Sequence, residues 1–133
     1  VEETLPYVRY LLGSAKDEFY SFCPKDDWKD SVRAFAVDGR TVISRMGGDG
    51  AFTVSPEGEF STEAFQVNVR NTTGAGDAFN AGFIAGMLRG LPLREAVRWG
   101  NGVAGYKVTG NSARHTPNET ELLDFMAHVP GKK

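Results

Sequence analysis

The sequence contains a single cysteine, Cys23, among its 133 residues. An internal disulfide therefore cannot form, and no cluster of thiolates can hold a structural metal ion. The 15 lysine and arginine residues nearly balance 17 aspartate and glutamate residues, and no basic run marks a surface for nucleic acid or membrane. These absences favour a cytoplasmic protein that acts on small molecules, without nucleic-acid or membrane partners.

Long apolar runs are also missing. No stretch reaches the roughly 18 apolar residues that a membrane-spanning helix needs. The start of the chain lacks the basic segment and the apolar centre of a signal peptide. Its first residue is Val1 rather than methionine, so we expect the chain to be part of a longer one.

Internal repeats and low-complexity linkers are absent, so residues 1–133 are expected to form a single domain. The first half predicts helices from Ser14 to Phe22 and around Trp28 to Phe35. It also contains short β-rich segments separated by turns, at residues 7–12, 41–46, 51–55 and 60–69.

The second half is predominantly helical in pattern. Apolar residues recur at helical spacing over residues 77–90 and again over residues 92–110. A last helix is expected with Thr116 as its N-cap, Pro117 at its first position and Glu119 completing a capping box. Strands first and then three helices indicate part of a layered α/β fold.

Small residues also mark one face of the first of these three helices. Gly82, Ala85 and Gly86 fall on that face. Their size predicts that the helix packs closely onto the sheet.

A glycine-rich stretch, Asn71-Thr72-Thr73-Gly74-Ala75-Gly76-Asp77, stands where a polar segment becomes helical. A helix that begins near Asp77 leaves its first N–H groups unpaired, and its peptide dipoles place about half a positive charge there. Gly74 and Gly76 allow positive φ and close approach of a ligand, while Ala75 keeps the loop narrow. The stretch therefore predicts a cradle for a phosphate or a phosphoryl group.

Asp77 has a catalytic and a structural interpretation. An ionised carboxylate at this position is suited to accept the proton of an attacking hydroxyl during phosphoryl transfer. However, the helix dipole alone favours an acid in a first turn, and glycine-rich turns are common. The spacing alone supports the two interpretations equally.

Other ligand-binding patterns are missing from the sequence. There is no G-x-x-x-x-G-K-[ST] for a P-loop, and no G-x-G-x-x-G opens a βαβ unit. His115 and His128 have no acidic or cysteine partner at metal-ligand spacing, so both are expected to be surface or capping histidines.

The glycine-rich stretch resembles the C-terminal signature D-T-x-G-A-G-D of the ribokinase-like (PfkB) carbohydrate kinases. The segment Arg45-Met46-Gly47-Gly48-Asp49-Gly50 is similar to the family's T-L-G-x-x-G turn. Asn101 falls where the family has an asparagine near the adenine, and residues 5–22 resemble the segment that carries its N-x-x-E motif. The resemblance implies the C-terminal part of a ribokinase-like layered α/β sandwich, without the N-terminal half that supplies most sugar contacts.

The resemblance also implies ATP-dependent phosphoryl transfer to a hydroxyl of a sugar or similar small molecule. Gly74, Ala75 and Gly76 would form the anion hole, and Asp77 would activate the acceptor hydroxyl. ATP would lie against a set of mostly small residues, for which helix packing is the alternative explanation: Arg45, Gly47, Gly48, Gly50, Asn101, Ala104, Gly105 and Val108.

The same resemblance implies binding sites for metal ions. Glu18 matches the acid of N-x-x-E, which organises Mg2+ near the phosphates, but Ala15 replaces the asparagine, so capping is an equal alternative. Arg45 replaces a threonine and would either pair with a phosphate or lie at a solvated strand end. K+ is a further candidate cofactor, with Asn71, Thr73 and Gly110 as its ligands, although Asn71 lacks the charge of the family's aspartate.

The resemblance leaves three interpretations of the chain. It is a kinase portion that is expected to be inactive in isolation, a non-catalytic nucleotide-binding or interaction module, or a purely structural fragment. A homo-oligomer is one candidate assembly, and a missing N-terminal half, carried by the same or another chain, would complete the acceptor site.

Overall fold

The computed structural model describes residues 8–110 and 114–131, which divide into two compact units. The first unit comprises the described residues up to Met46 together with Ala51–Ser61. The second comprises Gly47–Gly50 and the described residues from Thr62 onward.

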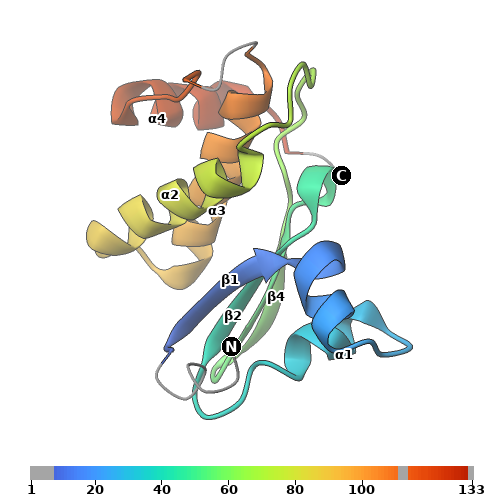
Figure 1. The fold of residues 1–133 in the computed structure, drawn as a ribbon. Helices are drawn as coiled ribbons and strands as arrows, with labels where there is room; N and C mark the ends of the chain where they lie inside the picture. Colours follow the sequence, from blue (N-terminus) through green and yellow to red (C-terminus); the bar gives the residue numbers. More distant parts are fainter. Residues whose placement is uncertain (1–7, 111–113, 132–133) are drawn as a thin grey trace. The chain divides into compact units, whose positions relative to one another are not determined.

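A four-stranded sheet in the order β1-β2-β3-β4 frames the first unit (Figure 1). Strand β1 (Tyr10–Ser14) is parallel to β2 (Thr41–Arg45), which is antiparallel to β3 (Ala51–Ser55), and β4 (Gly58–Thr62) follows. The connection from β1 to β2 carries a π-helical segment, η2 (Ala15–Tyr20), and helix α1 (Trp28–Arg33). This order confirms the predicted alternation of strands and helices.

Two predicted strand boundaries shift. The first β-rich segment was expected from Tyr7, which lies outside the described residues, and its strand begins at Tyr10. The last ends at Thr62 rather than Val69, because residues 63–69 contribute only an isolated bridge, from Phe65 to Gly131.

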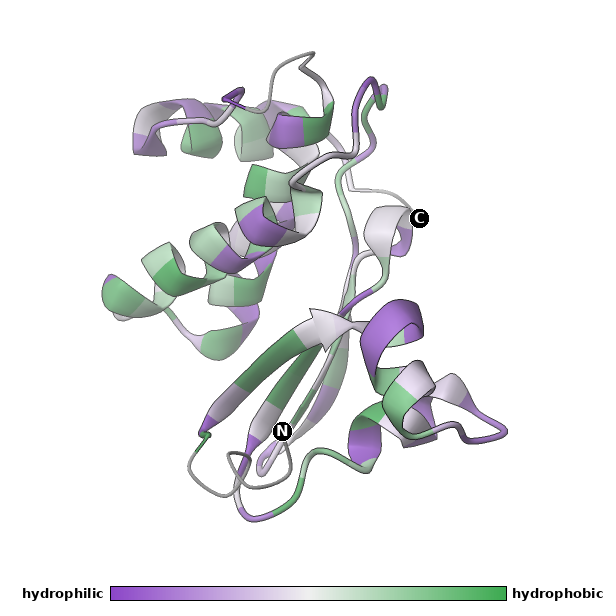
Figure 2. Cartoon of the chain, viewed as in Figure 1, coloured by the Kyte–Doolittle hydropathy of each residue, from purple (hydrophilic) through white to green (hydrophobic). Residues whose placement is uncertain are grey.

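Apolar side chains on one face of the sheet form the core of the first unit. Val42 and Phe52 pack against Phe19 of η2 and Val32 of α1. The ring of Trp28 meets the ring of Phe52 edge-on, with 5.6 Å between their centroids. Figure 2 shows the apolar residues concentrated along β1 and β2, as expected for strands covered by amphipathic helices.

Three helices follow in the second unit, as predicted: α2 (Ala75–Leu88), α3 (Leu93–Val108) and α4 (Glu119–His128). Gly90, at φ 74°, takes up the left-handed conformation that commonly ends a helix, and its N–H donates to the carbonyl of Met87. A short 3-10 turn, η3 (Gly47–Asp49), precedes β3. The core of this unit contains Phe65, Trp99, Leu122 and Met126.

The predicted start of α4 is wrong by two residues. Asn118, rather than Thr116, is the N-cap, and its Oδ1 accepts a hydrogen bond of 2.8 Å from the N–H of Glu121. The Glu121 carboxylate accepts in return from the N–H of Asn118, at 3.1 Å. Both S/T-x-x-E and N-x-x-E satisfy the capping-box pattern, so only the hydrogen bonds distinguish the two frames.

Glycines allow α2 and α3 to approach each other closely. A methyl group on Gly82 would lie 2.7 Å from the carbonyl oxygen of Trp99, and one on Gly86 would lie 2.9 Å from the Cα of Ala96. The prediction that this face packs onto the sheet is therefore wrong, because the partner of these two glycines is another helix. Helical periodicity shows which residues share a face but does not show what covers it.

The buried side-chain amide of Asn101 connects α3 to the last residue of β4 and to the residue after it. Asn101 is 5 % exposed, and its Nδ2 donates to the carbonyl oxygens of Thr62, at 3.3 Å, and Glu63, at 3.2 Å. Buried donors and acceptors are costly when unpaired, so these bonds stabilise the contact between the helix and residues 62–63. Among the described helices, none combines the length and the apolar character needed to cross a membrane.

We expect Gly82→Ala to lower the midpoint of thermal unfolding. Overpacking costs about 1–3 kcal/mol, whereas a helical glycine-to-alanine change gains only about 1 kcal/mol. The cost of the clash exceeds the gain in helix propensity, because the clash involves the backbone carbonyl of Trp99, which cannot move independently of α3. Gly105→Ala is the matched control, since its methyl group would meet Phe125 at an ordinary 3.5 Å. An unchanged midpoint in Gly82→Ala would contradict the described packing.

We expect Asn101→Ala to reduce the free energy of unfolding by about 1–3 kcal/mol, because the carbonyl oxygens of Thr62 and Glu63 lose the hydrogen bonds from a buried amide. Asn101→Asp should cost more, because it places a carboxylate against the same two oxygens. Chemical denaturation measures both effects, and Asn68→Ala, at an exposed position, is the control. Equal stability of Asn101→Ala and Asn68→Ala would rule out the structural role of the amide.

Candidate active site

The glycine turn opens helix α2. Gly74 is the N-cap residue and is left-handed, with φ 78° and ψ 7°, and among the described residues no side chain caps the helix. The N–H of Ala75 donates to the carbonyl of Thr72 at 3.1 Å, which closes the turn. The N–H groups of Gly76 and Asp77 belong to the first helical turn, where the helix itself offers no acceptor. The turn thus presents backbone donors at the positive end of the helix dipole.

Asp77 lies in the first turn of α2 and is exposed to solvent. An exposed carboxylate beside unpaired N–H groups can meet a small-molecule hydroxyl without rearrangement of the core. The position also suits the helix dipole, so the location of Asp77 remains compatible with both interpretations of this residue.

The end of α3 anchors the chain that leads into the turn. The carbonyl oxygen of Val108 accepts hydrogen bonds from the N–H groups of Arg70, at 2.7 Å, and Asn71, at 3.2 Å. Asn71 Oδ1 in turn accepts from the N–H of Thr73, at 2.8 Å. Val108 is itself buried, so in this structure it holds the turn through its backbone.

Two of the predicted nucleotide-binding positions meet at residues 62–64. Gly50, at φ 91°, leaves no room for a side chain, because a Cβ would overlap the carbonyl oxygen of Thr62. Asn101 donates to that same oxygen. The hydroxyl of Thr62 is buried and, within the described part of the chain, has no hydrogen-bond partner. Gly47 and Gly48 belong to η3, directly before Gly50.

Two small residues near the end of α3, Ala104 and Gly105, are half-buried. A methyl group on Gly105 would lie 3.5 Å from the ring of Phe125 and 3.6 Å from Cβ of Phe65. Ala104 is next to it in the same helix and is equally half-buried. The two distances at Gly105 are ordinary contact distances, so helix packing alone does not require glycine at position 105, and a place beside adenine stays a prediction for both residues.

Gly110 adjoins an aromatic pair that the sequence did not predict. The rings of Tyr106 and His115 stack with 4.6 Å between centroids, and a side chain on Gly110 would collide with His115. Burial, together with the hydrogen bond from the Tyr106 hydroxyl to Glu121, raises the pKa of Tyr106. His115 is half-buried, and its Nε2 lies 3.3 Å from the hydroxyl of Thr109, the C-cap residue of α3, whereas His128 is exposed at the end of α4.

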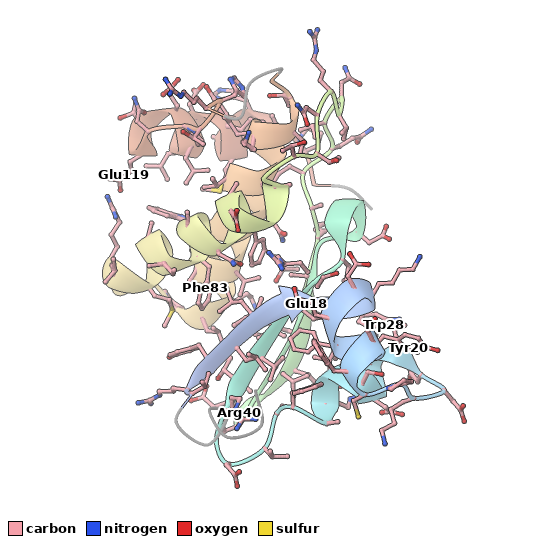
Figure 3. All side chains as sticks on the ribbon, viewed as in Figure 1. Glu18, Tyr20, Trp28, Arg40, Phe83 and Glu119 are labelled. Atoms are coloured by element: carbon pink, nitrogen blue, oxygen red, sulfur yellow. The ribbon has the colours of Figure 1, made fainter. Side chains whose placement is uncertain are left out.

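In the first unit, the structure brings Glu18 and Arg45 together. Glu18 Oε1 accepts from the N–H of Ser14, at 3.0 Å, and pairs with Arg45 Nη2, at 3.2 Å. Figure 3 shows Glu18 beside the end of β1. Glu18 thus makes a hydrogen bond of the kind expected of a capping residue, and Arg45 is its ion-pair partner. Across the described residues, no group of three His, Cys, Asp or Glu side chains could hold a metal ion.

A pocket of about 360 Å³ lies between α2, α3 and the start of α4. Trp99 and Leu122 contribute to its lining, and the guanidinium of Arg89 lies over the Trp99 ring, 5.6 Å from its centroid. Arg89 also pairs with Glu119 at 2.8 Å, and this hydrogen-bonded pair lowers the pKa of Glu119. The described residues that line the pocket include none of the predicted site residues.

Comparisons with known proteins place the chain among sugar kinases. The family model described as "pfkB family carbohydrate kinase" matches residues 1–121. A 5-dehydro-2-deoxygluconokinase of Shouchella clausii is 35 % identical over 141 residues, which cover 96 % of this chain and 43 % of that protein. The corresponding enzyme of Geobacillus thermodenitrificans is 30 % identical over 90 % of this chain and 37 % of its own length. The chain thus spans less than half of these curated relatives.

Solved structures show the same fold. Ribokinase of Thermotoga maritima superposes with a TM-score of 0.87 at 26 % identity, over 96 % of this chain and 45 % of that one. Aminoimidazole riboside kinase of Salmonella enterica, solved with aminoimidazole riboside and an ATP analogue, superposes with a TM-score of 0.81 at 31 % identity, over 93 % and 44 %. These matches confirm the predicted α/β class and its ribokinase-like layered architecture. The chain belongs to the pfkB family of carbohydrate kinases.

Proposed function

We propose that residues 1–133 form the C-terminal nucleotide-binding and catalytic portion of an ATP-dependent carbohydrate kinase. The reaction would transfer the terminal phosphoryl group of ATP to a hydroxyl of a sugar or a similar small molecule. Family membership supports the reaction class, and the Salmonella enterica relative was solved with a riboside and an ATP analogue.

The observation that carries this proposal is the uncapped, left-handed glycine turn that opens α2 beside an exposed Asp77. The N–H groups of Gly76 and Asp77 would donate to the oxygens of the phosphoryl group as its charge shifts during transfer. Gly74 allows the phosphate to come close to the backbone, because it has no side chain that would lie between them. Ala75, the small residue between the two glycines, keeps the turn narrow.

Asp77 would act as the proton acceptor in this reaction. The acceptor hydroxyl oxygen forms a bond to the terminal phosphorus while the bond from that phosphorus to the ADP oxygen breaks. The hydroxyl proton passes to the Asp77 carboxylate. Because phosphoryl transfer depends mainly on positioning and charge stabilisation, a carboxylate is a sufficient base.

The nucleotide would lie along α3 and the segments attached to it. Gly50 and Asn101 converge on the carbonyl oxygen of Thr62. The last turn of α3 holds the glycine turn through Val108. Asn101 and Val108 are about 10 Å apart along the helix axis, at a rise of about 1.5 Å per residue, so one elongated ligand could contact both residues.

Magnesium would enter this site with the phosphates of ATP. Mg2+ characteristically keeps several waters and binds through one or two carboxylates plus substrate phosphates, which suits a site without a cluster of acidic ligands. When bound, it neutralises charge on the phosphate oxygens. Arg45 already holds the Glu18 carboxylate at 3.2 Å, so Glu18 would act on Mg2+ only through water.

A K+ site remains part of the proposal. Its three candidate ligands are Asn71, Thr73 and Gly110. Asn71 and Thr73 are joined by the hydrogen bond within the turn, and an amide oxygen keeps a second lone pair for a cation.

We expect Asp77→Asn, introduced into the full-length natural protein, to reduce kcat by at least about 100-fold, because a general base commonly contributes 10²–10⁴-fold. The dissociation constant for ATP should change little, since the amide keeps the shape of the carboxylate. Steady-state kinetics and calorimetric titration with ATP and Mg2+ measure the two effects. Asp124→Asn, an exposed acid on α4, is the control. An unaltered kcat would refute the role of Asp77.

The same measurements separate a kinase from a non-catalytic module. A wild-type protein that binds ATP but phosphorylates no sugar in a broad substrate panel would favour the module. A protein that binds neither ATP nor ADP would contradict nucleotide binding altogether.

A further inference from the structure

The glycine turn has a buried lysine beside it. Lys107 lies in the last turn of α3 and is only 4 % exposed. A methyl group built on Gly74 would lie 3.4 Å from Cε of Lys107 and 4.0 Å from its Nζ. The end of this side chain is therefore next to the residue that opens the proposed anion hole.

The location of this lysine is unusual for a positive charge. Removing an ammonium group from water is costly unless nearby negative charge or hydrogen bonds compensate. The negative end of the α3 dipole contributes to that compensation, because Lys107 is in its last turn, and Lys107 has a further interaction partner as well. However, the Nζ lies next to Gly74, where the positive end of the α2 dipole begins, so two sources of positive potential converge on one turn.

Convergent positive potential suits a ligand with several negative charges. Backbone N–H groups and a helix dipole contribute partial charges, whereas an ammonium contributes a full one. Lysine is a common phosphate binder that acts as a point charge on a flexible stem. The long stem also allows Nζ to move by an ångström or more without any change in the helix that carries it.

We infer that Lys107 is a further phosphate-binding residue of this site, which places its ammonium on the terminal phosphates of the nucleoside triphosphate held at the Gly74 turn. The inference rests on the proposed kinase function, because it assigns a role in the same site. Lys107 belongs to none of the motifs that identify the family in this sequence. It reaches the turn only because α3 ends beside the start of α2.

The test compares two ligands that differ in phosphate content. Binding of ATP with Mg2+ and of adenosine is measured by calorimetry for the wild-type protein, Lys107→Met and Lys107→Arg. Methionine keeps the apolar stem and removes the charge, and arginine keeps the charge. Lys25→Met, at an exposed position, controls for the loss of one positive charge from the whole protein.

We expect Lys107→Met to weaken ATP binding by at least about tenfold, which corresponds to about 1.4 kcal/mol. Adenosine affinity should not change, and Lys107→Arg should retain most of the ATP affinity. Lys25→Met should bind both ligands as the wild type does.

Three results would overturn the inference in distinguishable ways. ATP affinity that is unchanged in Lys107→Met, while the wild type binds ATP, removes the role of Lys107 and leaves the proposed function intact. Equal weakening of ATP and adenosine, with a lower midpoint of thermal unfolding, shows that Lys107 is a packing residue. A wild-type protein that binds neither ligand refutes the proposed function, and the inference with it.

Discussion

The close approach of α2 and α3 is the contact on which the second unit depends. Gly82 and Gly86 bring the backbone of α2 against Trp99 and Ala96 of α3, where side chains on the two glycines would collide. Because the helices are joined by a short connection and run in opposite directions, this contact sets the start of α2 beside the end of α3. The position of the glycine turn is therefore a consequence of helix packing as well as of its own sequence.

This arrangement has an electrostatic result. The positive end of one helix dipole meets the negative end of the other, which stabilises the pair. The last turn of α3 then supplies two different contacts to the turn, a carbonyl oxygen from Val108 and the side chain of Lys107. One holds the chain that enters the turn, and the other adds charge to the place where we propose that phosphate binds.

Hydrogen bonds from a buried side chain of α3 also connect this helix to the residues against which Gly50 packs. Asn101 lies near the middle of α3, about two turns before its anchoring end, and it fixes Thr62 and Glu63. Gly50 fits against the same carbonyl oxygen of Thr62. A single helix thus organises both segments that the family resemblance associates with the nucleotide. Substitutions at these positions can therefore alter ligand binding through stability alone.

The sequence by itself determined the helices, most strands and the glycine turn, because apolar periodicity and turn residues act over a few neighbouring positions. It also identified Gly74 to Asp77, since that motif is contiguous. Only the tertiary structure decided that Gly82 faces a helix, that Arg45 pairs with Glu18, and that Lys107 reaches Gly74. These contacts join residues far apart in the chain, so no local pattern records them, and they arise only when packing places one element against another.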